Sequence, residues 1–167
     1  VDGGQSQIGI ESTVLALTVE PACVLRPGMI HAESLVAVIG ETRNAERGTR
    51  NALPALRSPG LLKKHYAPRA KLVVMGWRDA EDLKSQISNL KFQPAAAHVI
   101  AHTRIPSGAG FAGVSVVPHD AAAFARALYA EWHRCDAAGV EVIVTEAPPE
   151  LPEWSGIADR LTRAAAG

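Results

Sequence analysis

Beyond residue 70, short apolar segments alternate with amphipathic ones, and no other feature of the 167-residue sequence constrains the fold as strongly. The apolar segments show almost no polar alternation, which is typical of strands buried on both faces of a sheet. We therefore expect an α/β fold in which helices cover both faces of a mostly parallel sheet. The expected strands are 71–75, 97–101, 114–117 and 140–145, and the expected helices are 79–90, 120–138 and 155–166.

Local signals mark the ends of two of these helices. Asp79 and Asp120 precede first helical turns, where a carboxylate can accept hydrogen bonds from free backbone N–H groups. Gly139 follows the longer helix and can end it in a left-handed conformation. The stripe of that helix that should face the sheet consists of Phe124, Leu128 and Cys135.

The first forty residues form a smaller block. Residues 8–17 are rich in β-branched side chains and predict a strand, and residues 23–25 predict the strand that returns beside it. A short apolar stripe over 35–39 predicts a helix. One hairpin and one helix cannot bury a core, so we expect residues 1–45 to be the C-terminal remnant of a larger domain.

Residues 46–69 are expected to be a linker, and the lack of periodicity over 41–57 predicts irregular structure there. Pro59 and Pro68 restrict the backbone, so the segment between them should follow a preferred path. That segment contains two lysines, His65 and Tyr66, a set that suits an anionic, aromatic partner such as a nucleotide. A lid over a site and a solvated basic connector both fit this composition.

The charges are distributed unevenly along the chain. Residues 41–72 contain eight basic and two acidic side chains although the net charge of the whole chain is zero, so the flanking regions are acidic. A basic centre can attract partners that carry phosphate. A basic linker that lies across acidic domain surfaces would produce the same distribution.

Two motifs lack the structural context that their usual functions need. Residues 108–113 match the G-x-G-x-x-G pattern, but they precede an expected strand, whereas a dinucleotide-binding loop follows a strand and opens a helix. His98 and His102 have the spacing of a metal-binding helix. They fall in an expected strand, which would hold their side chains well apart, so we expect no metal site there.

Three glutamates, Glu146, Glu150 and Glu153, lie among prolines near the C-terminus. We expect a solvated acidic loop there, with catalysis by paired carboxylates as the alternative. Cys23 and Cys135 are far apart and belong to no CxxC motif, which predicts two buried, reduced thiols. No apolar run approaches the roughly 18 residues that a membrane-spanning helix needs.

Four motifs occur in a fixed order along the chain: Gly9-Ile10-Glu11-Ser12-Thr13-Val14, Val24-Leu25-Arg26-Pro27-Gly28, Ser58-Pro59-Gly60 with His65-Tyr66-Ala67-Pro68, and Gly156-Ile157-Ala158-Asp159-Arg160-Leu161. In these motifs and their order the chain resembles one enzyme family, the long form of the YrdC-like threonylcarbamoyl-AMP synthases. The resemblance implies the C-terminal part of a YrdC-like α/β domain at 1–45, an extended linker or lid at 46–69 and a small Rossmann-like domain at 70–167. It also implies a nucleotidyltransferase that converts L-threonine, bicarbonate and ATP to threonylcarbamoyl-AMP and pyrophosphate, for threonylcarbamoyladenosine formation in tRNA.

The resemblance implies roles for three residues. Ser12 matches a serine that contacts threonine, Arg26 matches an arginine that contacts ATP, and Tyr66 matches a linker tyrosine that reaches the nucleotide. ATP would bind as a substrate with Mg²⁺, without a metal held by the protein, and tRNA or tRNA-modification proteins are possible partners of a cytoplasmic, membrane-free enzyme. No catalytic residue is assigned, because the family's Lys-x-Arg pocket would precede Val1, and residues 1–167 alone are expected to be inactive.

Two other classes of function remain open. An RNA-binding module could use the basic centre, although Tyr66 is the one aromatic platform for bases there. A regulatory nucleotide-binding domain could use residues 70–167 without chemistry of its own, although no phosphate-binding glycine loop is visible. The salt dependence of RNA binding would distinguish the first of these classes.

Overall fold

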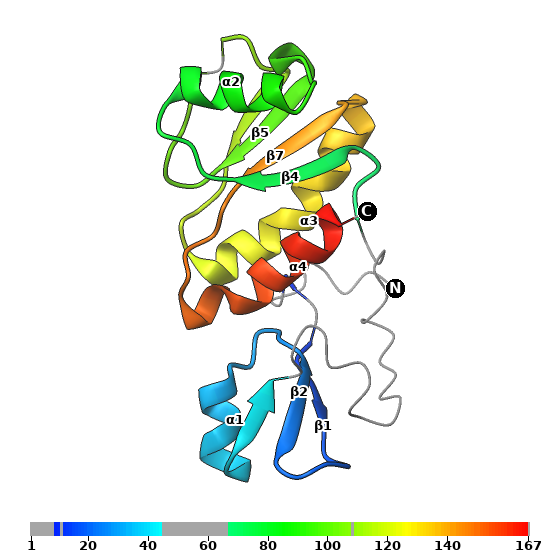
Figure 1. Cartoon of the computed structure of the whole chain (residues 1–167), viewed down its shortest axis with the longest axis vertical. Helices are drawn as coiled ribbons and strands as arrows, with labels where there is room; N and C mark the ends of the chain where they lie inside the picture. The colour runs from blue at the N-terminus through cyan, green and yellow to red at the C-terminus, as the bar shows by residue number, and fades with distance from the viewer. Residues whose placement is uncertain (1–8, 11, 45–66, 108, 167) are drawn as a thin grey trace, which may run out of the picture.

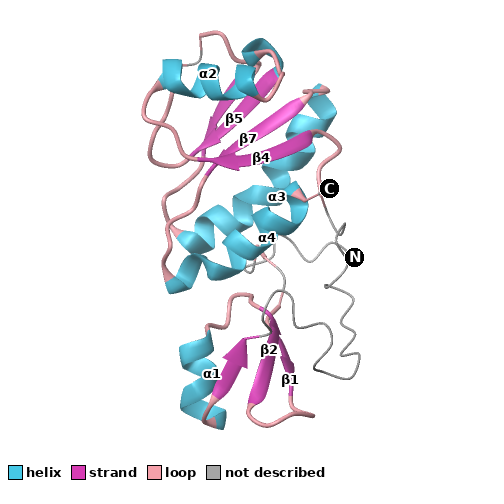
Figure 2. Cartoon of the chain, in the orientation of Figure 1, coloured by secondary structure: helices cyan, strands magenta, loops and turns pink. Residues whose placement is uncertain are grey.

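The computed structural model describes residues 9–10, 12–44, 67–107 and 109–166, which form two separate sheets (Figures 1 and 2). The three-stranded sheet has the order β1-β2-β3 and the four-stranded sheet the order β4-β7-β5-β6. The N-terminal elements are β1 (Val14–Ala16), β2 (Ala22–Arg26), α1 (Ala32–Ile39) and β3 (Thr42–Asn44). The C-terminal elements are β4 (Lys71–Met75), α2 (Ala80–Asn89), the 3-10 turn η2 (Pro94–Ala96), β5 (Ala97–Ala101), β6 (Gly113–Val116), α3 (Ala121–Ala138), β7 (Val142–Glu146), the 3-10 turn η3 (Pro152–Trp154) and α4 (Ser155–Ala165).

All strand pairings in the four-stranded sheet are parallel, which confirms the expected α/β class. Although β7 is the last strand along the chain, it lies between β4 and β5, and Val144 faces Val73 on one side and Val99 on the other. All five residues of β7 are buried, as its central position requires. The lack of polar alternation in this segment therefore reflects burial of the strand on both faces of the sheet, as expected.

Helices cover both faces of this sheet (Figure 2). On one face, Leu83 and Ile87 of α2 pack against a set of strand residues that includes Val99. On the other face, α3 and α4 pack against residues such as Ile143. The predicted stripe of α3, which consists of Phe124, Leu128 and Cys135, is buried in this second layer. Full burial of a large aliphatic or aromatic side chain contributes about 1.5–3 kcal/mol, so the two layers account for much of the fold's stability.

The helix-end signals are confirmed. Asp79 accepts a hydrogen bond from the backbone N–H of Asp82 at 2.8 Å, and Asp120 accepts one from that of Ala123 at 2.8 Å. Gly139 adopts φ 68° at the end of α3, in the left-handed region that a Cβ disfavours. The strand ends agree within one residue except for β7, which begins two residues later than expected, at Val142.

The N-terminal sheet differs from the expectation in two places. The predicted hairpin is present, but β1 is much shorter than the strand expected over 8–17. The expectation of irregular structure from residue 41 is wrong for Thr42–Asn44, which pairs with β2 in parallel as β3. Three residues are too few to show a period of two, and β3 forms because the second edge of β2 supplies its hydrogen-bond partners. Residues 45–66, which include most of the linker predicted over 46–69, lie outside the described part of the chain.

Helix α1 buries none of its residues against the parts of the chain that the structure describes. Its Val36, Val38 and Ile39 are exposed, and Leu17 after β1 is 72% exposed. Leu17 and Ile39 line one hollow of the surface, and exposed apolar side chains that lie together are typical of a surface that another element covers. The assignment of residues 1–45 to a larger domain remains a prediction, and this surface supports it.

The two parts of the chain touch through the layer formed by α3 and α4 (Figure 1). Ile10, which precedes β1, is 7% exposed and belongs to the core cluster of that layer. Met29, which follows β2, packs against the same cluster. The ends of the N-terminal hairpin are therefore attached to the C-terminal domain.

Both cysteines are buried and neither forms a disulfide. Burial raises the pKa of the Cys135 thiol to about 11, so this thiol is protonated at neutral pH. Among the described helices, none combines the length and apolar character that crossing a membrane requires.

Candidate functional site

Ser12 and Arg26, which were predicted from separate motifs, are in direct contact. Ser12 lies just before β1 and Arg26 ends β2, and the antiparallel pairing places Val14 opposite Arg26. The Arg26 guanidinium donates a hydrogen bond from Nε to the backbone carbonyl of Ser12 at 3.0 Å and another from Nη2 to Ser12 Oγ at 3.2 Å. The hairpin therefore joins the two candidate residues into one site.

Hydrogen bonds also hold the chain segments around this pair. The Thr13 hydroxyl donates to the carbonyl of Ile30 at 2.9 Å and accepts from the N–H of the same residue at 3.1 Å. The strand register shifts between Val14 and Leu15, and Val14 still pairs with Arg26 before the shift. Through its two hydrogen bonds Thr13 fixes the segment after β2 to the segment before β1.

The chemistry of the pair suits an anionic ligand with hydrogen-bond acceptors. Ser12 is exposed, and its Oγ already accepts from Arg26, so the hydroxyl hydrogen can be donated to a ligand oxygen. The guanidinium of Arg26 is planar and permanently charged, which suits carboxylate and phosphate oxygens. The third predicted residue, Tyr66, lies outside the described residues, so its relation to the pair remains a prediction.

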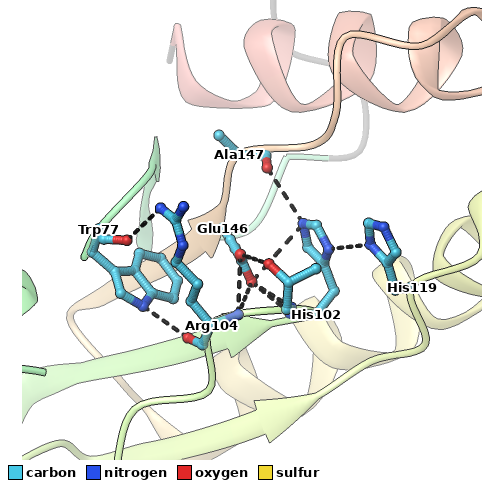
Figure 3. A network of polar contacts seen from close by, with 7 residues as sticks. Trp77, His102, Arg104, His119, Glu146 and Ala147 are labelled. Atoms are coloured by element: carbon cyan, nitrogen blue, oxygen red, sulfur yellow. Dashed lines mark hydrogen bonds and ion pairs between the residues drawn. The ribbon is translucent and has the colours of Figure 1, made fainter. Parts of the chain in front are cut away.

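A second polar cluster lies at the carboxyl ends of β5 and β7 (Figure 3). The carboxylate of Glu146 accepts hydrogen bonds from the backbone N–H groups of His102 at 2.7 Å, Thr103 at 2.9 Å and Arg104 at 3.2 Å. It also accepts one from the Thr103 hydroxyl. Burial acts to raise the pKa of Glu146, but the hydrogen bonds from Thr103, His102 and Arg104 outweigh it and hold this pKa below its usual value. Glu146 is therefore ionised and well supplied with donors.

His102 occupies the centre of the same cluster. Its Nε2 lies 3.3 Å from the carbonyl of Ala147 and its Nδ1 lies 2.8 Å from Nδ1 of His119. A carbonyl can only accept, so His102 donates from Nε2 and accepts at Nδ1 from His119. The ring also stacks on Trp154 with centroids 5.4 Å apart. Burial is the main reason why the pKa of His102 lies below its usual value, and the neutral imidazole is favoured.

This arrangement bears on the regulatory nucleotide-binding alternative. Ligands of open α/β sheets bind outside the carboxyl ends of the strands, and successive backbone N–H groups there commonly hold phosphate. In this domain three such N–H groups, from residues 102–104, are directed at the carboxylate of Glu146. The protein's own side chain thus occupies the position that a phosphate would need.

The expectation of a solvated acidic loop is wrong for Glu146, which is 5% exposed. β7 ends at Glu146, one residue later than expected. Because β5 and β7 are parallel neighbours, the end of β7 lies beside the backbone N–H groups that follow β5. Glu150 and Glu153 are exposed, as expected. Sequence reasoning also missed His119 and Trp154. Their position after apolar strands is the one signal that could have indicated this edge of the sheet.

The other two motifs have the predicted context. Gly113 is the first residue of β6, so the glycine pattern precedes a strand and does not open a helix. His98 contacts the Ser115 hydroxyl at 2.5 Å, away from the partners of His102. The described residues contain no group of three or more His, Cys, Asp or Glu side chains that could hold a metal ion.

Fold and site together define an α/β chain that joins an exposed serine and a half-buried arginine, paired on a small hairpin, to a compact parallel-sheet domain. A family model described as "Threonylcarbamoyl-AMP synthase, C-terminal domain" matches residues 30–166. The chain belongs to this family.

Individual proteins agree with the family match. The chain is 33% identical to the threonylcarbamoyl-AMP synthase of Pyrococcus abyssi over 166 residues, which cover 98% of the chain and 48% of that protein. It is 31% identical to the threonylcarbamoyl-AMP synthase of Bacillus subtilis over 173 residues, which cover 100% of the chain and 48% of that protein. The chain thus spans about half the length of the curated relatives that it matches.

Solved structures show the same likeness. A crystal structure of P. abyssi Sua5 complexed with L-threonine is similar with a TM-score of 0.77 and 27% identity, covering 98% of this chain and 48% of that one. A P. abyssi Sua5 variant in which an adjacent histidine and tyrosine are replaced by alanine is similar with a TM-score of 0.76 and 27% identity, covering 98% of this chain and 47% of that one.

Proposed function

We propose that residues 9–44 form one wall of the active site of a threonylcarbamoyl-AMP synthase. Such an enzyme converts L-threonine, bicarbonate and ATP to threonylcarbamoyl-AMP and pyrophosphate, the step that prepares threonylcarbamoyladenosine formation in tRNA. The observation that carries the proposal is the hydrogen-bonded pair of Arg26 and Ser12. The family match supports the choice of reaction.

Ser12 is proposed to contact threonine. Its exposed hydroxyl can donate to a substrate oxygen while the guanidinium of Arg26 fixes the position of Oγ. The similar P. abyssi structure contains L-threonine, which supports an amino acid as the ligand class. In the proposed reaction the threonine amino group attacks bicarbonate with loss of water, and Ser12 would hold the amino acid for this step.

Arg26 is proposed to contact ATP. After the threonine amine has formed a carbamate, a carbamate oxygen attacks the α-phosphorus of ATP and pyrophosphate leaves with the bond electrons. A guanidinium beside the phosphates stabilises the negative charge that increases during this transfer. Mg²⁺ would arrive as part of the ATP substrate, bound by phosphate oxygens, as is usual for nucleotide substrates.

Tyr66 is proposed to reach the nucleotide from the linker and to shield the carbamate from water. The chain has one adjacent His-Tyr pair, His65-Tyr66, and the adjacent histidine and tyrosine changed in the P. abyssi variant support attention to this pair. A segment that closes over a site excludes water from reactive intermediates. Tyr66 offers both a ring for the base and a hydroxyl for hydrogen bonding.

Substitutions in the full-length protein test the proposal. Arg26→Ala should weaken ATP binding by roughly 1.5–3 kcal/mol, the usual contribution of hydrogen bonds to a charged group. Tyr66→Phe should cost less, because the ring remains, and Tyr66→Ala should mainly lower turnover. ATP affinity by calorimetry and pyrophosphate release that depends on threonine and bicarbonate are the measurements.

Arg43→Ala is the matched control, because Arg43 is an exposed arginine on β3 of the same sheet. It should leave ATP affinity close to that of the unchanged enzyme. Equal effects of Arg26→Ala and Arg43→Ala would contradict the role of Arg26. Unchanged pyrophosphate release by Tyr66→Ala would mean that the linker is only a connector.

A further inference from the structure

Gly156, the second residue of α4, lies directly against the segment that follows Arg26. Gly156 and Gly28 are both buried. A Cβ added at Gly156 would lie 3.1 Å from the carbonyl oxygen of Gly28 and 3.2 Å from its Cα. Both neighbours are backbone atoms, which cannot rotate away as the end of a flexible side chain can. The C-terminal domain thus contacts the site-bearing segment two residues beyond Arg26.

A second backbone contact lies on the other side of the site. Gly9 is three residues before Ser12, and a Cβ at Gly9 would fall on the backbone of Arg126 in α3. The residue after it, Ile10, is buried in the core layer of α3 and α4. The segment that leads into Ser12 therefore packs directly on α3, and the segment that follows Arg26 packs directly on α4. These two packing sites are called the Gly9 contact and the Gly156 contact.

Hydrogen bonds within the Ser12–Arg26 site connect the Gly9 contact with the Gly156 contact. Thr13 is hydrogen-bonded to Ile30 on the far side of Gly28, and Arg26 is hydrogen-bonded to Ser12. A shift of the backbone at either contact would therefore move Ser12 relative to Arg26. At both contacts backbone lies against backbone, and no side chain lies between them that could adjust to such a shift.

We propose that Gly156 and Gly9 are positioning residues, through which the C-terminal domain sets the distance and orientation between Ser12 and Arg26. The domain would then act on the binding of ATP and threonine without touching either substrate. This inference rests on the proposed function of the Ser12–Arg26 pair. It gives the Gly156 of the C-terminal motif a physical role that helix formation does not explain, because alanine is the better helix former.

The test uses the full-length enzyme and separates KM from kcat. Gly156→Ala should raise the KM for ATP and for threonine about tenfold, well within the roughly hundredfold effect of a 1 Å misplacement at a reacting site. Gly156→Val should raise both further, because it adds more atoms against Gly28. Gly9→Ala should also raise both KM values, because it disturbs the contact with α3. A merely structural role would lower the amount of active enzyme and thus kcat, while KM stayed unchanged.

Gly76→Ala is the matched control, because a Cβ there meets no atom within 4 Å and Gly76 has no positive φ. It should leave both KM values unchanged. If Gly156→Ala behaves like Gly76→Ala, or lowers kcat alone, the positioning role is overturned. Circular dichroism identifies any variant that fails to fold, and Gly156→Ala, the smallest change, then decides the question.

Arg26→Ala is assayed in parallel to separate this inference from the proposed function. If Arg26→Ala weakens ATP binding and Gly156→Ala does not raise KM, the site assignment stands and the positioning role fails. If Arg26→Ala leaves ATP binding unchanged, the site assignment itself fails, whatever the glycine variants do.

Discussion

The N-terminal hairpin unit and the C-terminal domain bury very different amounts of apolar surface. The C-terminal sheet is covered on both faces by two core clusters. Among the described residues of the N-terminal unit, the buried apolar side chains are Ala16, Cys23 and Val24, together with Ile10, which packs into the core of the C-terminal part. Yet the N-terminal unit carries the Ser12–Arg26 pair. The part that holds the candidate chemistry thus depends on its neighbours for stability.

The polar groups of the two parts differ in the same way. Glu146 is buried and accepts hydrogen bonds from three backbone N–H groups, so its carboxylate is already occupied. Ser12 is exposed, and its hydroxyl hydrogen is available to a ligand. A polar residue that is fully satisfied inside a domain stabilises the fold, whereas one at an exposed strand end can bind a substrate.

The largest expected effect separates the two parts physically. Residues 67–167 expressed alone should melt cooperatively, because both core clusters are retained apart from Ile10 and Met29. Residues 1–44 alone should show no cooperative transition, since no residue of α1 is fully buried and the hairpin has few core residues among those that the structure describes. Calorimetry and amide hydrogen exchange measure both. Strong amide protection in residues 1–44 would break the comparison, and a non-cooperative melt of 67–167 would show that the boundary is wrong.

A substitution in each part sharpens the comparison. Phe124 is 1% exposed in the layer of α3, and Phe124→Ala should lower the free energy of unfolding by about 3–5 kcal/mol through lost burial and a residual cavity. Leu17 is 72% exposed in the N-terminal unit, and Leu17→Ala in this chain should change it by at most about 0.5 kcal/mol. Urea titration measures both variants. Similar losses for the two would contradict the assignment of the core to the C-terminal domain.

A smaller loss than that of Phe124→Ala is expected from a change at Glu146. Glu146→Gln should lower the free energy of unfolding at neutral pH by about 1.5–3 kcal/mol, because charge-assisted hydrogen bonds become neutral ones and an amide N–H₂ faces other donors. The folded-state pKa of Glu146 lies below its usual value, so its contribution is complete above about pH 4.3 and is lost as pH falls through the folded value. The difference between the two proteins should therefore shrink only in acid.

Glu150→Gln is the control for this experiment, because Glu150 is exposed in the loop after β7. It should change the unfolding free energy little at any pH. A difference between Glu146→Gln and the unchanged chain that stays constant down to pH 3 would show that the carboxylate charge is not the stabilising feature.

Local patterns were sufficient to predict most of the C-terminal elements. The bounds of β4 and β5, the caps at Asp79 and Asp120 and the left-handed Gly139 all depend on residues close in sequence. β3 could not be predicted in this way, because three residues show no period and the pairing partner lies about twenty residues away. The burial of Glu146 was missed for a similar reason, since its donors are more than forty residues away.

The sequence by itself determined the α/β class, the helix ends and, through the order of its motifs, the two candidate residues Ser12 and Arg26. Only the tertiary structure decided that these two residues share hydrogen bonds, that β7 lies between β4 and β5, and that Gly156 meets Gly28. The physical reason is the distance along the sequence between the residues that interact. Helix caps and strand burial follow from the chemistry of neighbouring residues, whereas strand order and backbone-to-backbone contacts depend on how distant segments fill the space between them.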